Sequence, residues 1–324
     1  MSQQPLQIGL IGFGCVAQGF YQHLLSSDLP AEIRHICVKD ELKPRNAPVS
    51  LITTRLATVL NDPEVDVIVE LISDDEVAFE IAKKCFERGT PLISANKKMI
   101  AERLPQLLTL QSSPFYFEGA VAGSIPVIHN LQQYFRHQHI TEIRAILNGS
   151  SNYILTQLSG GNCTFAEALK EAQEKGFAEA DPTLDISGRD AANKLTILAY
   201  EAFDEQLDVN KIATQNLQEL TPADIRAAQL DGLKIKQIAT LKRTAHGLHA
   251  QVKLAHIDSS DPLYFVDQEY NAIQINLPDI GHQLFYGKGA GSLPTGAAVF
   301  HDLQLLLEKR EITQSDQTIQ KKVA

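Results

Sequence analysis

The sequence has little positive charge, no long hydrophobic run and no closely paired cysteines. Its 324 residues carry 29 lysines and arginines against 39 aspartates and glutamates, which gives a net charge of −10. Because nucleic-acid binding needs a basic surface, we expect no nucleic-acid partner. No apolar run reaches the roughly 18 residues of a membrane span, and the polar N-terminus lacks the features of a signal peptide. We therefore expect a cytoplasmic protein without a membrane partner.

The cysteines are too few and too scattered for a disulfide framework or a thiolate metal cluster. None of them forms a CxxC pair, so we expect buried free thiols. They are Cys15, Cys37, Cys85 and Cys163.

The first third of the chain alternates apolar strand patterns with helical patterns. Val65–Ile72 is apolar on both faces, as a strand covered by helices on each side must be. A helix is expected over Val77–Arg88, ended by Gly89. Such alternation predicts an α/β fold with a Rossmann-type, doubly wound parallel sheet. The other expected strands are Leu6–Phe13, Ile33–Val38, Pro91–Ala95 and Phe115–Val121.

After about residue 130 the pattern changes to an α+β arrangement with a largely antiparallel sheet. Thr164 and Glu167 form a capping box at the start of one helix. The expected helices are Thr164–Lys175, Asp190–Phe203, Leu233–Leu241 and Thr295–Arg310, followed by a frayed tail after Thr313. The expected strands are Ile140–Leu147, Ala250–His256, Leu263–Asp267, Ala272–Leu277 and Gln283–Gly287. Two domains follow: residues 1–130, completed by 290–324, as a nucleotide-binding domain, and residues 131–289 as a substrate-binding domain.

A dinucleotide-binding turn is predicted between the first strand and the first helix. The segment Gly12-Phe13-Gly14-Cys15-Val16-Ala17 has glycines where a tight turn approaches a pyrophosphate, and a small residue where helix packs on strand. An ordinary glycine-rich turn is the alternative. At the end of the second strand, Lys39 and Arg45 favour NADP, whereas Asp40 leaves NAD open, and a solvated charged loop is the alternative interpretation.

Charged residues gather at two further places. Lys97 follows a strand in Ser94-Ala95-Asn96-Lys97, where ligands bind in open parallel sheets, although a solvated lysine is the simpler interpretation. Glu179, Asp181 and Asp185 crowd the loop before a helix that carries Asp190 and Lys194 on one face. These carboxylates beside a lysine suit a substrate with an ammonium group and a reacting oxygen. A helix cap and a surface ion pair are the alternatives for Asp190.

Three segments rich in small residues suit ligand contacts or plain turns equally well. Glu118–Pro126 could hold a monovalent cation or serve as a hinge. Asn148–Tyr153 could present backbone N–H groups to a carboxylate or merely cap a helix. Gly287–Gly296 permits close backbone approach to a ligand, or is a structural turn.

Taken together, these segments resemble homoserine dehydrogenases over nearly the whole chain. The resemblance is strongest in Ile146–Leu155, Thr164–Leu198 and Gly287–Val299. It implies NAD(P)-dependent interconversion of L-aspartate 4-semialdehyde and L-homoserine, a step in the biosynthesis of threonine, methionine and isoleucine. It also implies a homodimer formed by the middle domain.

The resemblance implies roles for individual residues. Lys97 and Lys194 would act on the reacting oxygen, with Asp190 orienting Lys194. The substrate would be bound by Glu179, Asp185, Gly149, Ser150 and Tyr153. The cofactor would be contacted by Gly12, Gly14, Cys15, Val16, Lys39, Ala95, Asn96, Lys97 and Gly291. A sodium ion would be held by Glu118 and the carbonyls of Val121, Gly123 and Ile125.

The sequence departs from the family pattern in three places. Ser73-Asp74-Asp75 stands where a Gly-Gly turn near the nicotinamide is expected, which could alter the charge preference for the cofactor. The Glu118-Gly119-Ala120 turn has more glycine than usual. The chain ends soon after the last predicted helix, so we expect no regulatory ACT domain and no threonine feedback through one.

Two other functions are compatible with parts of this pattern. A related oxidoreductase acting on another small amino acid would share the fold, but a substrate without an amino group would not need Glu179 and Asp185. A catalytically inactive nucleotide sensor would be expected to have lost Lys97, Lys194 or Asp190, and all are present.

Overall fold

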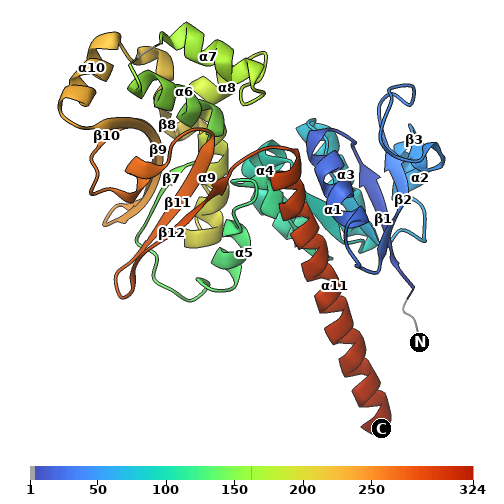
Figure 1. Cartoon of the computed structure of the whole chain (residues 1–324). Helices are drawn as coiled ribbons and strands as arrows, with labels where there is room; N and C mark the ends of the chain where they lie inside the picture. The colour runs from blue at the N-terminus through green and yellow to red at the C-terminus, as the bar shows by residue number, and fades with distance from the viewer. Residues whose placement is uncertain (1–3, 162, 324) are drawn as a thin grey trace. The chain divides into compact units, whose positions relative to one another are not determined.

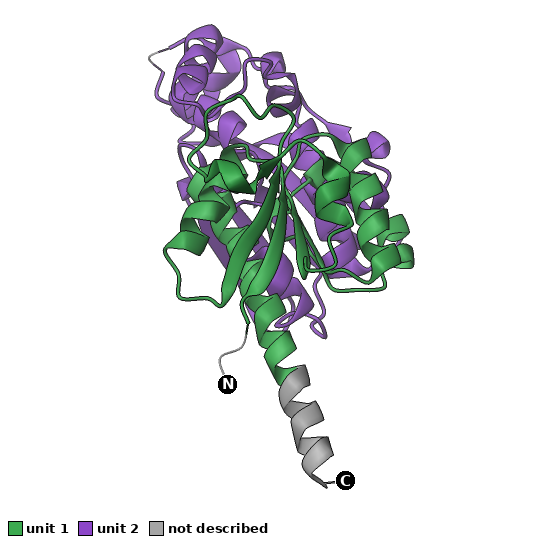
Figure 2. Cartoon of the chain, turned by 90° about the vertical axis from the view of Figure 1, so that its right-hand side faces the viewer, with its two compact units in different colours: residues 1–99, 105–120, 291–324 green, residues 100–104, 121–290 purple. Residues whose placement is uncertain are grey.

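The chain divides into two compact units. The computed structural model describes residues 4–161 and 163–323, with side chains described up to residue 312. Unit 1 comprises residues 1–99, 105–120 and 291–324, and unit 2 comprises residues 100–104 and 121–290 (Figure 2). Each unit contains its own six-stranded sheet.

The sheet of unit 1 is parallel throughout and has the order β3-β2-β1-β4-β5-β6. This order is that of the Rossmann fold, and it confirms the predicted α/β class. The strands are β1 (Leu6–Ile11), β2 (Ala31–Cys37), β3 (Ile52–Thr53), β4 (Val67–Glu70), β5 (Leu92–Ser94) and β6 (Phe115–Tyr116) (Figure 1).

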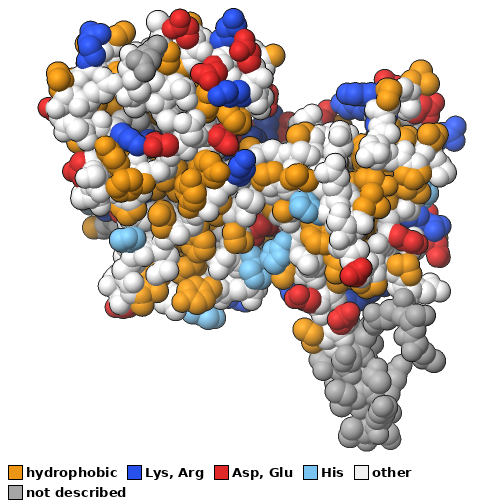
Figure 3. Space-filling model, viewed as in Figure 1, with side chains coloured by type: hydrophobic (Ala, Val, Ile, Leu, Met, Phe, Trp, Pro, Cys, Tyr) orange, Lys and Arg blue, Asp and Glu red, His pale blue; other side chains and the backbone are white. Residues whose placement is uncertain are grey.

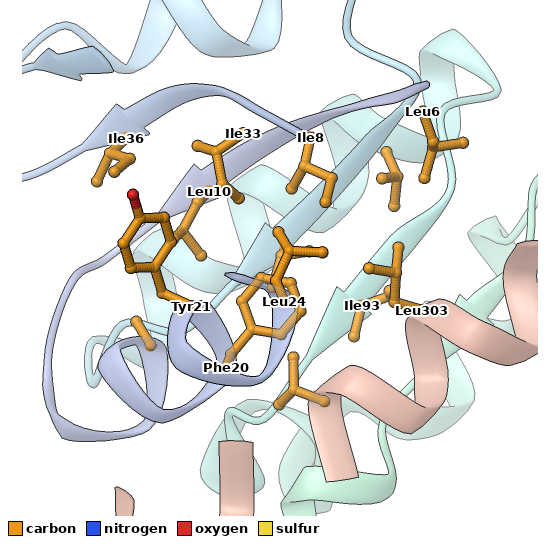
Figure 4. Close-up of a cluster of buried hydrophobic side chains, with 14 of the residues drawn as sticks. Leu6, Ile8, Leu10, Phe20, Tyr21, Leu24, Ile33, Ile36, Ile93 and Leu303 are labelled. Carbon is orange, nitrogen blue, oxygen red and sulfur yellow. The ribbon is translucent and has the colours of Figure 1, made fainter. Parts of the chain in front are cut away.

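Helices cover this sheet and bury an apolar core. The core includes Leu10 of β1, Phe20 of α1 and Leu303 of α11, all fully shielded from solvent (Figure 4). As predicted, α3 ends at Gly89, which has the left-handed φ of 66°. The helices are α1 (Cys15–Leu25), α2 (Leu56–Leu60), α3 (Asp75–Arg88), α4 (Lys97–Leu110) and α11 (Ser292–Val323), with short 3₁₀ helices η1 (Val49–Leu51) and η2 (Glu118–Ala120).

Glycines bring the C-terminal helix close to the first helix. A Cβ on Gly19 of α1 would lie 1.9 Å from the carbonyl oxygen of Ser292, and one on Gly296 of α11 would lie 2.4 Å from the nitrogen of Phe20. Only residues without side chains permit this approach. The last segment of the chain is therefore tied to the dinucleotide-binding helix of unit 1.

The sheet of unit 2 is mixed and has the order β12-β11-β7-β9-β10-β8, antiparallel except for the β8–β10 pair. The predicted α+β class is confirmed. The strands are β7 (Glu142–Ile146), β8 (Ala213–Thr214), β9 (Lys234–Thr244), β10 (Gly247–Ile257), β11 (Tyr270–Leu277) and β12 (Gly281–Lys288). The helices are α5 (Val127–Gln132), α6 (Gly149–Ser159), α7 (Phe165–Glu174), α8 (Thr183–Ile186), α9 (Arg189–Phe203) and α10 (Pro222–Leu230), with 3₁₀ helices η3 (Val209–Lys211), η4 (Leu217–Glu219) and η5 (Pro262–Phe265).

Two secondary-structure predictions in unit 2 are wrong. The segment Leu233–Leu241 was expected to be helical but lies in β9, because pairing with β7 and β10 on both sides overrides its local pattern. The segment Leu263–Asp267 was expected to be a strand. It begins instead as the 3₁₀ helix η5, where the side chain of Asp261 caps the N–H of Leu263 at 3.0 Å.

Smaller corrections concern the ends of elements and the thiols. The predicted strand Phe115–Val121 stops at Tyr116 and turns into η2, and α11 continues beyond the predicted end at Arg310. Cys37 and Cys85 are buried free thiols as expected, whereas Cys15 is exposed and Cys163 is half-buried. Across the described residues, no helix has the length and apolar character needed to cross a membrane.

Candidate active site

The glycine turn of unit 1 has the geometry of a dinucleotide site. Gly12 has a φ of +92°, and a Cβ there would lie 2.6 Å from the carbonyl oxygen of Leu71, so the turn requires glycine. Gly14 is the N-cap of α1, and a Cβ there would meet no atom within 4 Å. The space beside the N-cap of α1 is therefore open, and no side chain caps the free backbone N–H groups of its first turn. Cys15 is exposed, Val16 is half-buried and Ala17 is buried beneath this turn.

The end of β2 exposes the residues predicted to read the adenosine ribose. Lys39 and Asp40 are both exposed. The carboxylate of Asp40 accepts the N–H of Leu42 at 2.9 Å, so one of its oxygens is used in the local turn. The guanidinium of Arg45 donates to the carbonyl of Lys43 at 2.7 Å.

Asn96 joins two loops at the carboxyl end of the parallel sheet. Its side-chain oxygen accepts the N–H of Met99 at 3.0 Å, which caps α4, and its amide nitrogen donates to the carbonyl of Ile72 at 3.1 Å. Lys97 is the first residue of α4 and is exposed, directly after this buried cap. Ala95 is half-buried, and its N–H donates to the carbonyl of Glu70 at 3.4 Å.

The unusual acidic loop of unit 1 has structural partners. Asp74 caps α3 by accepting the N–H of Val77 at 3.0 Å, and Asp75 forms an ion pair with Lys98 at 2.9 Å. The acidic residues at this turn therefore stabilise the start of α3, where carboxylates are favoured by the helix dipole.

In unit 2 a largely buried network joins the predicted site residues Asp185, Asp190 and Lys194 to Asn148. The ammonium of Lys194 lies 2.8 Å from Oδ2 of Asp190 and donates to the carbonyl of Leu147 at 2.6 Å. The amide of Asn148 donates to the same Asp190 oxygen at 2.9 Å and to Asp185 at 2.8 Å. Asp190 is 3% exposed and Lys194 is 7% exposed, so the surface-pair interpretation is wrong.

Caps place this network at the starts of two helices. The Asn148 side chain is the N-cap of α6 and accepts the N–H of Ser151 at 2.8 Å. The N-cap of α9 is Gly188, with a φ of 78° and no side-chain cap, so the helix-cap alternative for Asp190 is also wrong. The carboxylate of Asp190 is not used as a helix cap and pairs with Lys194, one turn further along α9.

The other predicted substrate residues have varied surroundings. Gly149 begins α6, and a Cβ there would lie 2.6 Å from the carbonyl oxygen of Glu269. The hydroxyl of Ser150 donates to the carbonyl of Phe177 at 2.5 Å. Tyr153 is buried, and its hydroxyl accepts a hydrogen bond from Lys175 at 2.8 Å. Glu179 is exposed, outside the hydrogen bonds that join Asn148 to its acidic partners.

The glycine-containing turns have irregular backbones. Ala122 and Gly123 both have a φ of 55°, and the buried residues Val121 and Ile125 flank them. Glu118, in unit 1, is 2% exposed, and its N–H donates to the carboxylate of Asp302 at 2.9 Å. Burial, and then the charge of Glu118, raise the pKa of the Asp302 carboxyl. Gly291, which precedes α11, has a φ of +116°.

Comparison with known proteins identifies the family. A family model described as homoserine dehydrogenase matches residues 126–304, and one described as its NAD-binding domain matches residues 12–114. The chain belongs to the homoserine dehydrogenase family. It is 36% identical to the homoserine dehydrogenase of Neisseria gonorrhoeae, over 93% of this chain and 72% of that protein. It is 32% identical to that of Bacillus subtilis, over 95% of this chain and 74% of that protein.

Solved structures of homoserine dehydrogenases share the fold. The Thiobacillus denitrificans structure superposes with a TM-score of 0.88 at 34% identity, covering 92% of this chain and 72% of that one. A Staphylococcus aureus structure gives a TM-score of 0.82 at 34% identity, covering 96% and 78%. The chain is therefore an NAD(P)-dependent oxidoreductase that interconverts L-aspartate 4-semialdehyde and L-homoserine. This reaction belongs to the biosynthesis of amino acids derived from aspartate.

Two residues of this homoserine dehydrogenase that form buried hydrogen bonds in the structure, Asn148 and Glu70, were not singled out from the sequence. Asn148 was part of a noted motif, but its link to Asp185 and Asp190 could not be seen before α6 and α9 were brought together. Glu70 is fully buried at the end of β4. A carboxylate at the end of the otherwise apolar run Val67–Ile72 was the signal that could have identified it.

Proposed function

We propose that the buried network of unit 2 binds the reacting end of homoserine, with Lys194 at the oxygen. The observation that carries this proposal is the ion pair of Lys194 with Asp190, which is held in turn by Asn148. A carboxylate partner keeps a buried lysine ionised and fixes its direction. Positive charge placed in advance stabilises the alkoxide that develops at the substrate oxygen.

Lys97 is proposed as the group that exchanges the proton. It lies at the first turn of α4 and is exposed, so it can exchange protons with solvent, whereas Lys194 is buried. When bound, the nicotinamide cofactor supplies or accepts the hydride. The chain's own residues must then hold the oxygen and move its proton, and two lysines divide these tasks.

The substrate's charged groups find complementary partners in the same part of unit 2. We assign its ammonium to Asp185, whose carboxylate accepts a hydrogen bond from Asn148, and to Glu179 of the same acidic loop. Its carboxylate is assigned to the first turn of α6, where Gly149 and Ser150 place backbone N–H groups at a helix N-terminus. Tyr153 is assigned to the wall of this site through its place on the same helix.

For the cofactor we propose NADP, with NAD as the weaker alternative. Lys39 and Arg45 follow β2 as basic groups, and Asp40 directs a carboxylate oxygen to Leu42 within its own turn. A 2′-phosphate suits such a loop better than a free 2′-hydroxyl. An archaeal homoserine dehydrogenase solved with NADPH has the same fold, with a TM-score of 0.81. Gly12, Gly14, Cys15, Val16, Ala95, Asn96 and Gly291 complete the proposed cofactor contacts.

A monovalent cation is proposed at the segment that follows η2. Among the described residues, no three His, Cys, Asp or Glu side chains gather as a metal site, so such an ion would rely on backbone oxygens. Left-handed conformations at Ala122 and Gly123 turn successive peptides in different directions, which suits the carbonyls of Val121, Gly123 and Ile125. Glu118 supplies the buried carboxylate.

A homodimer through unit 2 is also proposed. Strand β12 lies at the edge of its sheet and exposes Leu284 and Tyr286. Figure 3 shows hydrophobic side chains over this part of unit 2. An exposed edge with apolar side chains favours association with a second copy. We expect light scattering of the protein as it elutes from a size-exclusion column to give twice the mass of the chain. The mass of a monomer would contradict this assignment.

The proposed reaction is tested by an absorbance assay with L-homoserine at high pH, where release of the proton favours oxidation. We expect reduced nicotinamide to accumulate only when homoserine is present, and faster with NADP than with NAD. Absence of a signal with both cofactors, from protein shown to be folded, would contradict the proposed use of the site. Faster reaction with NAD would overturn only the cofactor preference.

A further inference from the structure

A buried carboxylate connects the strand ends of unit 1. Glu70 is the last residue of β4 and is fully buried. One of its oxygens accepts the N–H of Ile72 at 2.8 Å, and the other accepts the hydroxyl of Ser94, the last residue of β5, at 2.5 Å. Burying a carboxylate is energetically unfavourable, so the presence of Glu70 at the end of an apolar strand indicates a specific role for this side chain.

The hydrogen bonds continue from Glu70 to the start of α4. The hydroxyl of Ser94 accepts the N–H of Asn96 at 3.1 Å, and Asn96 caps the helix whose first residue is Lys97. The amide of Asn96 then returns to the carbonyl of Ile72 at 3.1 Å, which closes a ring around Glu70. The loops after β4 and β5 are therefore fixed to each other through one carboxylate.

The same segment supports the dinucleotide turn. The N–H of Leu71 donates to the carbonyl of Ile11 at 2.8 Å, at the end of β1. The carbonyl of Leu71 faces Gly12 so closely that a Cβ on Gly12 would be 2.6 Å from it. A shift of the segment that follows Glu70 would therefore move the wall of the glycine turn as well as the cap of α4.

We propose that Glu70, acting through Ser94 and Asn96, is a positioning residue that holds the cofactor loops and Lys97 of unit 1 in their working arrangement. The part that concerns Lys97 rests on the function proposed above. The part that concerns the cofactor loops does not, because it rests on the ring of hydrogen bonds and on Gly12 alone.

The protonation state of Glu70 should control this arrangement. Burial raises the pKa of Glu70 to about 7, against the hydrogen bonds from Ser94 and Ile72, which lower it. The titratable group that faces it from α3 is Cys85, whose burial raises the pKa of its thiol to about 12 and keeps it neutral. Ionised Glu70 accepts both hydrogen bonds, whereas the protonated form must turn one oxygen into a donor. The ring in its observed arrangement, with Ser94 as the donor to Glu70, is thus formed only above the pKa of Glu70, because below it the carboxyl must donate to Ser94 and displace the hydroxyl proton.

The test is a titration of NADPH affinity by cofactor fluorescence, on both sides of the pKa of about 7, in the wild-type protein and in Glu70→Gln. We expect wild-type affinity to fall as the pH drops through this value. Glu70→Gln should lack this dependence and bind weakly at every pH. In the assay it should lower kcat by up to about 100-fold, as expected for misplaced reacting groups, and leave KM for homoserine nearly unchanged.

Ser94→Ala serves as the second variant if Glu70→Gln folds poorly. It keeps the carboxylate but breaks the link to Asn96, so kcat should fall and the pH dependence of NADPH affinity should be lost, as in Glu70→Gln. The matched control is Glu201→Gln in unit 2, because burial also raises the pKa of that carboxyl to about 7. This control should behave as wild type.

The outcomes separate this inference from the proposed mechanism. If Glu70→Gln keeps the wild-type pH dependence and kcat, the positioning role is overturned. If Lys97→Ala keeps full activity, the role proposed for Lys97 fails, but the effect of Glu70 on NADPH affinity is still measured. Loss of the pH dependence in Glu201→Gln would likewise overturn the assignment to Glu70.

Discussion

The ammonium of Lys194 lies 2.8 Å from Oδ2 of Asp190, and the two buried side chains stand one turn apart on α9. Asn148, from the start of α6, donates to the same oxygen at 2.9 Å. One carboxylate thus receives a charged and a neutral donor from two elements of unit 2. Because removal of one partner from such a pair leaves a buried charge, stability and catalysis must be measured separately.

Lys194→Ala should lower turnover by at least the about 100-fold typical of a lost acid–base or charge-stabilising group. It should also destabilise the fold by about 3–5 kcal/mol, because Asp190 remains buried without its cation. The double variant Lys194→Met with Asp190→Asn removes both charges and should recover stability but not activity. Lys170→Ala, from the exposed pair with Glu174 on α7, is the control and should change neither quantity. Wild-type turnover in Lys194→Ala would remove this lysine from the mechanism.

Asn148→Asp tests the network without removing the helix cap. An aspartate accepts the N–H of Ser151 as asparagine does, so α6 should keep its start. It cannot donate to Asp185 and Asp190, and it places like charges at distances now near 2.9 Å. We expect a severe loss of kcat/KM with α-helical content unchanged by circular dichroism. Asn148→Ser, which caps without added charge, should lose less, and the reverse order of activities would contradict the proposed electrostatic role.

Gly14→Ala should fold normally and yet bind NADPH poorly. The residue has a φ of −82°, and its new methyl group would meet no protein atom within 4 Å. The methyl group would occupy the space in which a pyrophosphate approaches α1. Thermal melting should match that of the wild-type protein, while the Kd for NADPH rises. Gly12→Ala is the contrast, because a positive φ and the nearby Leu71 oxygen should lower stability as well. Unchanged affinity in Gly14→Ala would place the cofactor elsewhere.

The strand and helix order of unit 1 was predictable because its signals are local. The pattern around Gly12 and the stop at Gly89 depend on residues adjacent in sequence, and both are confirmed. The segment Leu233–Leu241 was misassigned because its state depends on neighbours far away in the chain. Its strand β9 pairs with β7 and β10, and such pairing is invisible to a local pattern.

The site was predictable as residue types but not as contacts. The acidic loop and Lys194 were singled out by their composition, whereas the burial of Asp190 and Lys194 follows from tertiary packing. The Asp74 and Asp75 departure was interpreted through the cofactor, and the partners that the structure gives these residues, Val77 and Lys98, were not predicted. The link from Glu70 to Asn96 passes through Ser94, and a chain of side-chain hydrogen bonds has no sequence signature.

Lys39→Ala should lower the preference for NADP over NAD. If Lys39 contacts the 2′-phosphate, loss of this charged hydrogen bond should raise KM for NADP about ten-fold or more. KM for NAD, which has a hydroxyl at that position, should stay nearly constant. Lys211→Ala, an exposed lysine of unit 2, is the control. Equal changes for both cofactors would mean that Lys39 does not read the phosphate.

Glu70→Gln should stabilise the protein at high pH even as it impairs cofactor binding. The pKa of Glu70 is raised from 4.5 to about 7, so the folded state holds a proton that the unfolded state has released in this interval. The wild-type free energy of unfolding therefore falls as the pH rises from 4.5 towards 7, by about 3 kcal/mol, and stays low above it. Glutamine does not ionise and escapes this loss. Chemical denaturation at pH values below and above this interval should show that the free energy of unfolding of the variant increases relative to that of the wild-type protein as the pH rises. A stability difference that does not change with pH would show that the pKa of Glu70 is the same in the folded and unfolded states, and would contradict its elevation by burial.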